Sequence, residues 1–135
     1  MLNDAEFVES RLTSVRCFEK EKRVEFMFSL QNGGERIVAA EGVSRMLVQE
    51  MREQNIVERI DVYDSNSRNE DLQWAARVLA IPDDTTDPAA FTSVIESIVN
   101  QVITNGQVLI VITPVYGATV IALASKSRTS VLTVE

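Results

Sequence analysis

The residues of this chain that are best suited to chemistry are carboxylates, which gather in two places. Asp61 and Asp64 flank Tyr63, and the second group is Asp83, Asp84 and Asp87. Further oxygen-bearing side chains follow the first group at Asn66, Asn69, Glu70 and Asp71. Such ligands suit Ca²⁺ or Mg²⁺, but their spacing is not that of an EF-hand loop. Acids near expected helix starts are favoured by the helix dipole, so we expect capping and solvation here, with no bound metal or cofactor.

Catalytic groups are scarce. The chain contains no histidine, which removes the commonest general acid–base group and the commonest metal ligand. A Ser-His-Asp or Cys-His arrangement therefore cannot form within one chain. The single cysteine, Cys17, lies in an expected strand, where we expect a small buried hydrophobe. Carboxylates with one cysteine match zinc poorly, and the few aromatics do not favour a glycosidase cleft. We expect no enzyme.

The charge distribution argues against phosphate-bearing ligands. None of the five glycines lies in a phosphate-loop or dinucleotide-binding pattern. The net charge is −7, and no basic residue lies between Arg77 and Lys126. Affinity for nucleic acid depends mainly on lysine and arginine, so we expect no nucleic-acid partner. A basic protein partner fits this balance better.

Three aromatic residues are candidates for a binding surface. Trp74 lies two positions from both Leu72 and Ala76, and so beside the apolar stripe of its expected helix. It either widens the buried face or stands exposed as an anchor, and the same two alternatives apply to Tyr63 and Tyr116. Exposed tryptophan and tyrosine are typical of interface hot spots. The partner-binding candidates are Asp61, Tyr63, Asp64, Trp74, Asp83, Asp84 and Tyr116.

Length and composition predict one domain over residues 1–135. Hydrophobic residues make up 45% of the sequence and charged residues 24%, which is ordinary for a globular protein. A lone cysteine rules out an internal disulfide framework, and the first residues lack the features of a secretory signal. The longest apolar run, residues 108–112, is too short to span a bilayer. We therefore expect a cytoplasmic protein without a membrane partner.

The elements that must position these residues begin with an antiparallel meander. Alternation predicts strands over residues 12–18 and 24–30, and Asn32-Gly33-Gly34 predicts a reversal into a third strand at residues 36–40. Ser44 is expected to cap a short helix to about Glu53, although a loop is the alternative. Residues 56–63 are expected to form a fourth strand. Ile56, Ile60 and Val62 would then share one face, opposite Arg59, Asp61 and Tyr63.

Two helices and further strands follow. Ser67-x-x-Glu70 reads as a capping box for a helix that Pro82 ends, and Asp87 with Pro88 predicts the start of a second helix that ends near Gly106. Residues 108–113 are apolar on both faces, which predicts a central strand covered on both sides or an interface on one side. A turn at residues 114–117 is expected to precede strands at residues 120–124 and 131–134. The expected fold is α+β, with a meander and a C-terminal hairpin packed against two main helices.

One segment carries a resemblance. The run EGVSRMLVQEMREQNIVERI, residues 41–60, resembles small acidic bacterial α+β proteins of uncharacterised function, some of them similar to immunity or antitoxin proteins. The resemblance implies neutralisation of a toxin by binding. It rests on turn positions such as Gly42 and Asn55, and so transfers no functional residue.

These observations favour a non-enzymatic protein-interaction module, such as an immunity-type inhibitor or an accessory subunit, that binds a basic protein. The alternative is a structural, self-assembling homo-oligomer, of a phage or a secretion system, which associates through residues 108–112 and 131–134. An enzyme that uses carboxylates or a metal held by them is the third hypothesis.

Overall fold

The computed structural model describes residues 4–82 and 84–131 and is mixed α+β, with one antiparallel sheet of eight strands and two α-helices. The strands are β1 (Arg11–Phe18), β2 (Arg23–Ser29), β3 (Glu35–Glu41), β4 (Arg45–Gln49), β5 (Ile56–Tyr63), β6 (Val108–Tyr116), β7 (Thr119–Ala124) and β8 (Lys126–Val131). The helices are α1 (Asn69–Ala80) and α2 (Thr92–Asn105), with short 3₁₀ segments η1 (Asp4–Phe7), η2 (Glu19–Glu21) and η3 (Pro88–Phe91).

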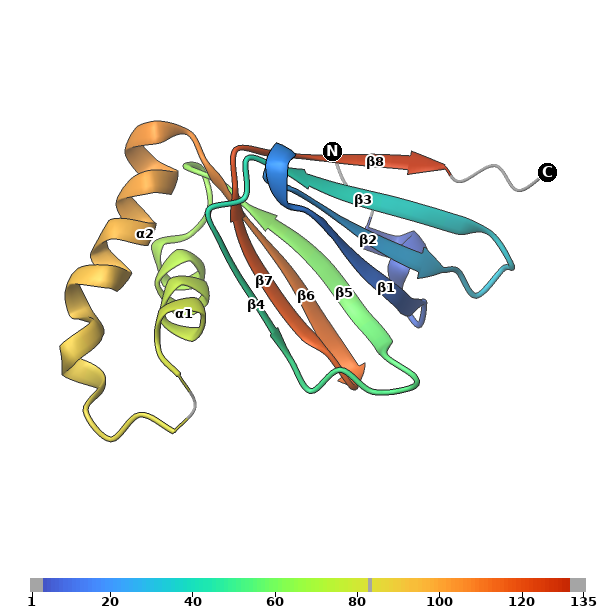
Figure 1. Cartoon of the computed structure of the whole chain (residues 1–135), viewed down its shortest axis with the longest axis horizontal. Coiled ribbons are helices and arrows are strands. Elements are labelled where there is room, and N and C mark those ends of the chain that lie inside the picture. The colour runs from blue at the N-terminus through green and yellow to red at the C-terminus, as the bar shows by residue number, and fades with distance from the viewer. Residues whose placement is uncertain (1–3, 83, 132–135) are drawn as a thin grey trace.

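The sheet has the order β4-β7-β6-β5-β1-β2-β3-β8 and folds into two halves (Figure 1). Two long antiparallel segments, β3–β4 and β7–β8, pass from one half to the other at a shared corner. At this corner Gly42 has a φ of +67°, and an added Cβ would overlap Ser125 Oγ. A glycine is therefore required by both the backbone conformation and the close approach.

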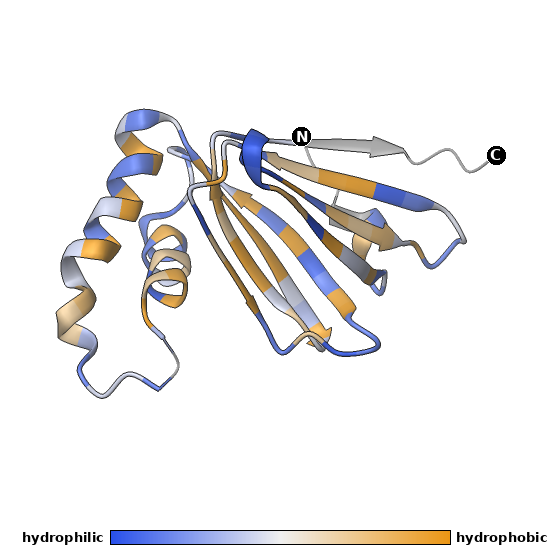
Figure 2. Cartoon of the chain, in the orientation of Figure 1, coloured by the Kyte–Doolittle hydropathy of each residue, from blue (hydrophilic) through white to orange (hydrophobic). Residues whose placement is uncertain are grey.

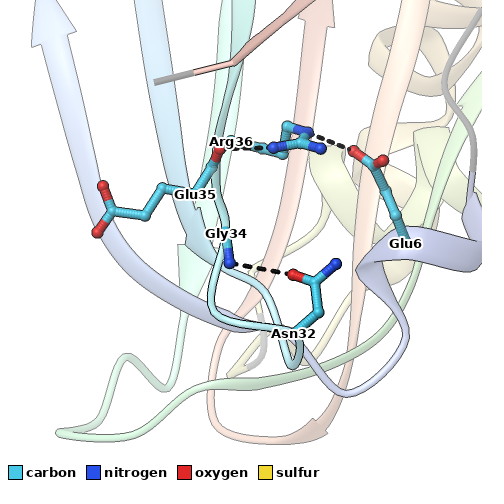
Figure 3. Close-up of polar contacts among 5 residues, drawn as sticks. All are labelled: Glu6, Asn32, Gly34, Glu35 and Arg36. Atoms are coloured by element: carbon cyan, nitrogen blue, oxygen red, sulfur yellow. Dashed lines mark hydrogen bonds and ion pairs between the residues drawn. The ribbon is translucent and has the colours of Figure 1, made fainter. Parts of the chain in front are cut away.

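The main core lies between the inner faces of the two halves. Alternation along β2 buries Val24, Phe26 and Phe28, as expected from the sequence. Phe7 of η1 enters the same core and meets the Phe28 ring edge-on, with ring centroids 5.0 Å apart. The Arg36 guanidinium, 2.9 Å from Glu6, ties η1 to the start of β3 beside the turn where Gly34 N–H donates to Asn32 (Figure 3). The short N-terminal segment thus covers one open side of the folded sheet.

A second core lies between the helices and the outer face of β6 and β7. Leu109, Val111, Ile121 and Leu123 meet α1 and α2, whereas Ile110 and Ile112 point into the main core. Figure 2 shows the resulting hydrophobic bands along β6 and β7 and the hydrophilic connections between elements. The prediction of a central strand apolar on both faces is confirmed, and its two faces are covered within one chain.

The helices cover only one half of the sheet, so the expected packing on the meander is only partly right. Helix α1 lies against β4, β6 and β7, and α2 packs mainly on α1. Helix α1 begins at Asn69 without a side-chain cap bond, so the capping box at Ser67 is wrong; Ser67 Oγ instead accepts a hydrogen bond from Asp64 N–H. Gly106 ends α2 in the left-handed conformation, as predicted.

The largest error concerns residues 44–53, where β4 replaces the expected helix. β4 pairs with β7 in register, from Arg45 opposite Leu123 to Gln49 opposite Thr119. Leu47, Val48 and Met51 have a spacing that suits either a helix or a strand over so short a stretch, and the distant partner strand decides between them. The predicted turn from Pro114 is also wrong, because β6 continues to Tyr116 beside an irregularity in β5.

Smaller differences follow from the way the sheet folds. Cys17 is exposed, not buried, because β5 pairs with β1 only at Arg11 and leaves the far end of β1 uncovered. Irregular pairing near Val57 turns that side chain into the main core, in place of Ile56. Val99 is buried in the second core. A last strand is present but starts at Lys126, and the predicted residues 132–134 lie outside the described part of the chain.

Candidate functional site

The sequence candidates separate into two regions at opposite ends of β5 and β6. Tyr63 pairs with Leu109 at one end, and Ile56 pairs with Tyr116 at the other. At about 3.3 Å per residue, the seven steps along β5 from Ile56 to Tyr63 correspond to about 23 Å. Tyr116 therefore cannot belong to the same contact surface as Tyr63 unless the partner is large.

The first region contains Asp61, Tyr63 and the start of α1. Asp61 is half-buried and lies 2.9 Å from Arg59 in an ion pair. Burial raises the pKa of Tyr63, and the negative charges of Asp61 and Asp71 raise it further, while Arg59 lowers it. Tyr63 packs against the second core, so it is part of the structure as well as of the surface. In the same pair, the hydrogen bond and charge of Asp61 raise the pKa of Arg59.

The remaining acids of the prediction do not join this region as a cluster. Asp64 is exposed, and its Oδ1 accepts a hydrogen bond from Asn66 N–H within a tight turn. Asp84 is exposed and follows the C-terminal end of α1, a helix about 18 Å long, whereas Asp61 and Tyr63 precede its start. Asp83 lies outside the described residues. Among the described residues, no three histidine, cysteine or acidic side chains come together as a metal site requires.

Trp74 is the largest exposed hydrophobic side chain of the helical layer, with 47% of its surface accessible. It lies one turn after Asp71 on the solvent side of α1, so of the two alternatives the structure shows the exposed side chain. Arg77 is the only basic residue between Asn69 and Asn105, whereas acids recur at Glu70, Asp71, Asp84, Asp87 and Glu96. Trp74 is thus an isolated aromatic on an acidic layer.

The second region carries a group of exposed side chains that lie together, which we call the Tyr116 patch: Met51, Arg52 and Tyr116. Met51 is 45% exposed and Tyr116 49%, and Val115, which precedes Tyr116 in β6, is 64% exposed but does not line the same depression. The Arg52 guanidinium lies over the Tyr116 ring, 5.5 Å from its centroid. Tyr116, Met51 and Arg52 also line an open depression of about 750 Å³. Methionine, arginine and tyrosine are the types enriched in protein interfaces.

Asn55 holds this patch together. Its Oδ1 accepts hydrogen bonds from Arg52 N–H at 2.9 Å and Ala118 N–H at 3.0 Å, while its Nδ2 donates to Arg52 O at 2.9 Å. Gly117, with a φ of +94°, lies so close to Asn55 that a Cβ would be 3.0 Å from Asn55 Cα. One buried amide therefore joins the loop that carries Met51 and Arg52 to the turn after Tyr116, which makes the patch a fixed platform.

Two acidic side chains lie beside the Tyr116 patch. Glu53 lines the same depression, and Glu50 lies 3.6 Å from Arg52, the one basic residue of the segment 50–58. The patch contains no candidate base or nucleophile beyond the Tyr116 hydroxyl. Its arrangement suits contact with another molecule through apolar anchors and negative charge.

Sequence reasoning found Tyr116 but missed Met51 and Arg52, which were placed in an expected helix. The signal that was present in the sequence is the pair Val115-Tyr116, two large apolar residues directly before Gly117. The structure contains no helix long and apolar enough to cross a membrane within its described residues. Comparisons of the chain with protein-family models, curated proteins and solved structures find no significant match.

Proposed function

We propose that this protein is a non-catalytic interaction module that binds a basic protein partner through the Tyr116 patch. The observation that carries the proposal is the exposure of Tyr116 and Met51 on a platform fixed by Asn55. Binding would mask the surface of the partner, as in an immunity-type inhibitor or an accessory subunit.

The energetic argument is that of an interface hot spot. Large side chains that are half exposed in the free protein gain most from burial against a partner, because each removes apolar surface from water at about 25 cal/mol per Å². A fixed platform loses little conformational freedom on binding, which preserves that gain. The Arg52 guanidinium lies over the Tyr116 ring and is paired with Glu50, so it restrains the ring while its positive charge is offset within the chain.

The negative charge of this protein indicates that the partner presents a basic surface. Glu50 and Glu53 border the patch, and the whole chain has a net charge of −7. A field of this sign speeds the encounter with a basic surface and disfavours acidic ones. Screening by salt shortens the reach of that field to about 10 Å at 0.1 M. Association should therefore slow as salt is added.

The test uses the intact protein to capture a partner from the native cell, followed by affinity measurements with that partner purified. Tyr116→Ala and Met51→Ser should each weaken binding, Tyr116→Ala by about 30-fold or more, the size expected of a hot spot. Glu53→Lys should slow association. Unchanged affinity in both Tyr116→Ala and Met51→Ser would rule out the patch.

Trp74→Ala is the matched variant, because Trp74 is an equally exposed aromatic on another face. If Trp74→Ala or Asp61→Lys weakens binding while Tyr116→Ala does not, the partner binds the acidic helical layer. If the captured partner is acidic, the charge argument fails. Turnover of a small molecule by the purified protein would contradict a non-catalytic role.

A further inference from the structure

Strand β4 leaves one side of the sheet open to pairing. It ends the sheet order beside β7, and no described strand pairs with its other edge (Figure 1). In an antiparallel ladder, successive residues direct their N–H and C=O groups alternately toward the two neighbours. Alternate residues of β4 therefore direct backbone groups away from β7.

The outer edge of β4 lacks several of the features that block pairing at edge strands. Lysine, proline and bulges are common blocks of this kind. β4 reads RMLVQ, with Arg45 as its one charged residue, and its pairing with β7 runs without a register shift. Val48 is 36% exposed, and Met46 and Leu47 are only half-buried. By contrast β8, at the other end of the sheet, begins with a lysine, Lys126.

We propose that β4 pairs antiparallel with β4 of a second copy of this chain, about a twofold axis at Leu47. This register sets Leu47 opposite Leu47, Met46 opposite Val48, and Arg45 opposite Gln49. Residues of like orientation then face each other, so the outward N–H and C=O groups of one strand meet those of the other. A shift by one residue would oppose outward groups to inward ones, and a shift by two would leave residues of this short strand unpaired.

The side chains agree with this register. Met46 and Val48 lie on one face and would meet across the axis, while Leu47 would meet its counterpart on the other face. Arg45 begins the strand and Glu50 directly follows it, and both are exposed. Antiparallel pairing sets Arg45 of each copy opposite Gln49 of the other and so next to Glu50, which also pairs with Arg52 of its own chain.

The dimer is expected to be weak, and its stability is expected to rise with salt concentration. A five-residue edge is small beside stable interfaces, which bury about 1,200–2,000 Å². Each copy has a net charge of −7, so added salt should strengthen self-association by screening the mutual repulsion. Binding of a basic protein at the Tyr116 patch should respond in the opposite sense. The two associations are thus distinguishable.

The test is disulfide trapping in a Cys17→Ser background, because Cys17 is the only native cysteine and is exposed. Leu47→Cys should oxidise to a covalent dimer, since this residue meets its own copy at the axis. Arg45→Cys alone should not, whereas Arg45→Cys with Gln49→Cys should. Trapping by Arg45→Cys alone would contradict the register, and no trapping in Leu47→Cys or the double variant would overturn the proposal.

Light scattering of the native sequence provides a measurement that needs no engineered cysteine. A rising dimer fraction is expected toward about 1 mM protein, the range of weak binding. Val48→Lys should abolish it, and Val8→Lys, which changes an exposed valine elsewhere, should not. A monomer at every concentration and salt level would overturn the proposal. Val48→Lys should still bind the basic partner, so loss of the dimer and loss of the Tyr116 function can be told apart.

Discussion

Gly42 and Ser125 meet where the sheet changes direction, and the conformation of one residue there has consequences for the whole fold. The φ of Gly42 is +67°, and Ser125 N–H donates to Glu41 O at 2.8 Å beside it. The sequence shows Gly42 as a break in a strand. It does not show that the strand resumes after a bend, because that depends on Ser125, which lies far along the chain.

Gly42→Ala and Gly106→Ala form a matched pair that separates backbone strain from crowding. Gly106 has nearly the same φ, +68°, but no atom within 4 Å of an added Cβ. Left-handed backbone costs alanine about 1–2 kcal/mol. We expect that loss of unfolding free energy for Gly106→Ala and a larger loss for Gly42→Ala, measured by urea denaturation. Ser125→Gly should recover part of the difference, and equal losses in the two single variants would show that the corner is not crowded.

Tyr63 supplies a prediction about pH. Its folded-state pKa lies above the usual 10.0, first because of burial and then because of Asp61 and Asp71. The resulting stability is fully present below pH 10 and is lost as the pH rises through the folded pKa. The chain has two tyrosines, so Tyr116→Phe leaves Tyr63 as the sole phenol. Its tyrosinate absorbance should titrate above pH 10, and Asp61→Asn should lower the midpoint. A midpoint at or below 10 would contradict the burial of Tyr63.

At the level of elements, local patterns predict a strand when the hydrophobic residues show which of its faces are buried. The alternation of β2 reveals one buried and one open face, and the continuous apolar run of β6 reveals two covered faces. β4 could not be predicted in this way. Its five residues match a helix as well as a strand, and it forms a strand because β7 pairs with it. The same non-local pairing brings Asn55 to Ala118 and so creates the Tyr116 patch.

Helix α1 gives a contrast between a buried and an exposed side chain in one turn. Leu72 is 1% exposed and lies in the second core, whereas Trp74 is 47% exposed. Leu72→Ala should cost about 2–5 kcal/mol of unfolding free energy, and Trp74→Ala less than about 1 kcal/mol, despite the larger volume removed. Thermal and urea denaturation of both variants tests this. A large loss in Trp74→Ala would mean that the tryptophan supports the fold and is not available as an anchor.

At the level of the whole molecule, both proposed contacts involve the half of the sheet formed by β4, β7, β6 and β5. The helices cover the outer face of β6 and β7, so the doubly apolar strand that suggested self-assembly is accounted for within one chain. The apolar side chains that remain exposed near the ends of β4 and β6 are Val48, Met51, Val115 and Tyr116. The proposed contacts with other molecules therefore use side chains of this half that the helices leave exposed.

The most direct measurement is hydrogen exchange of the intact protein with and without its purified partner. Binding at the Tyr116 patch predicts that the amides of residues 50–54 and 115–118 gain protection, while those of α1 exchange as in the free protein. Protection confined to residues 61–74, with none around Tyr116, would contradict the account.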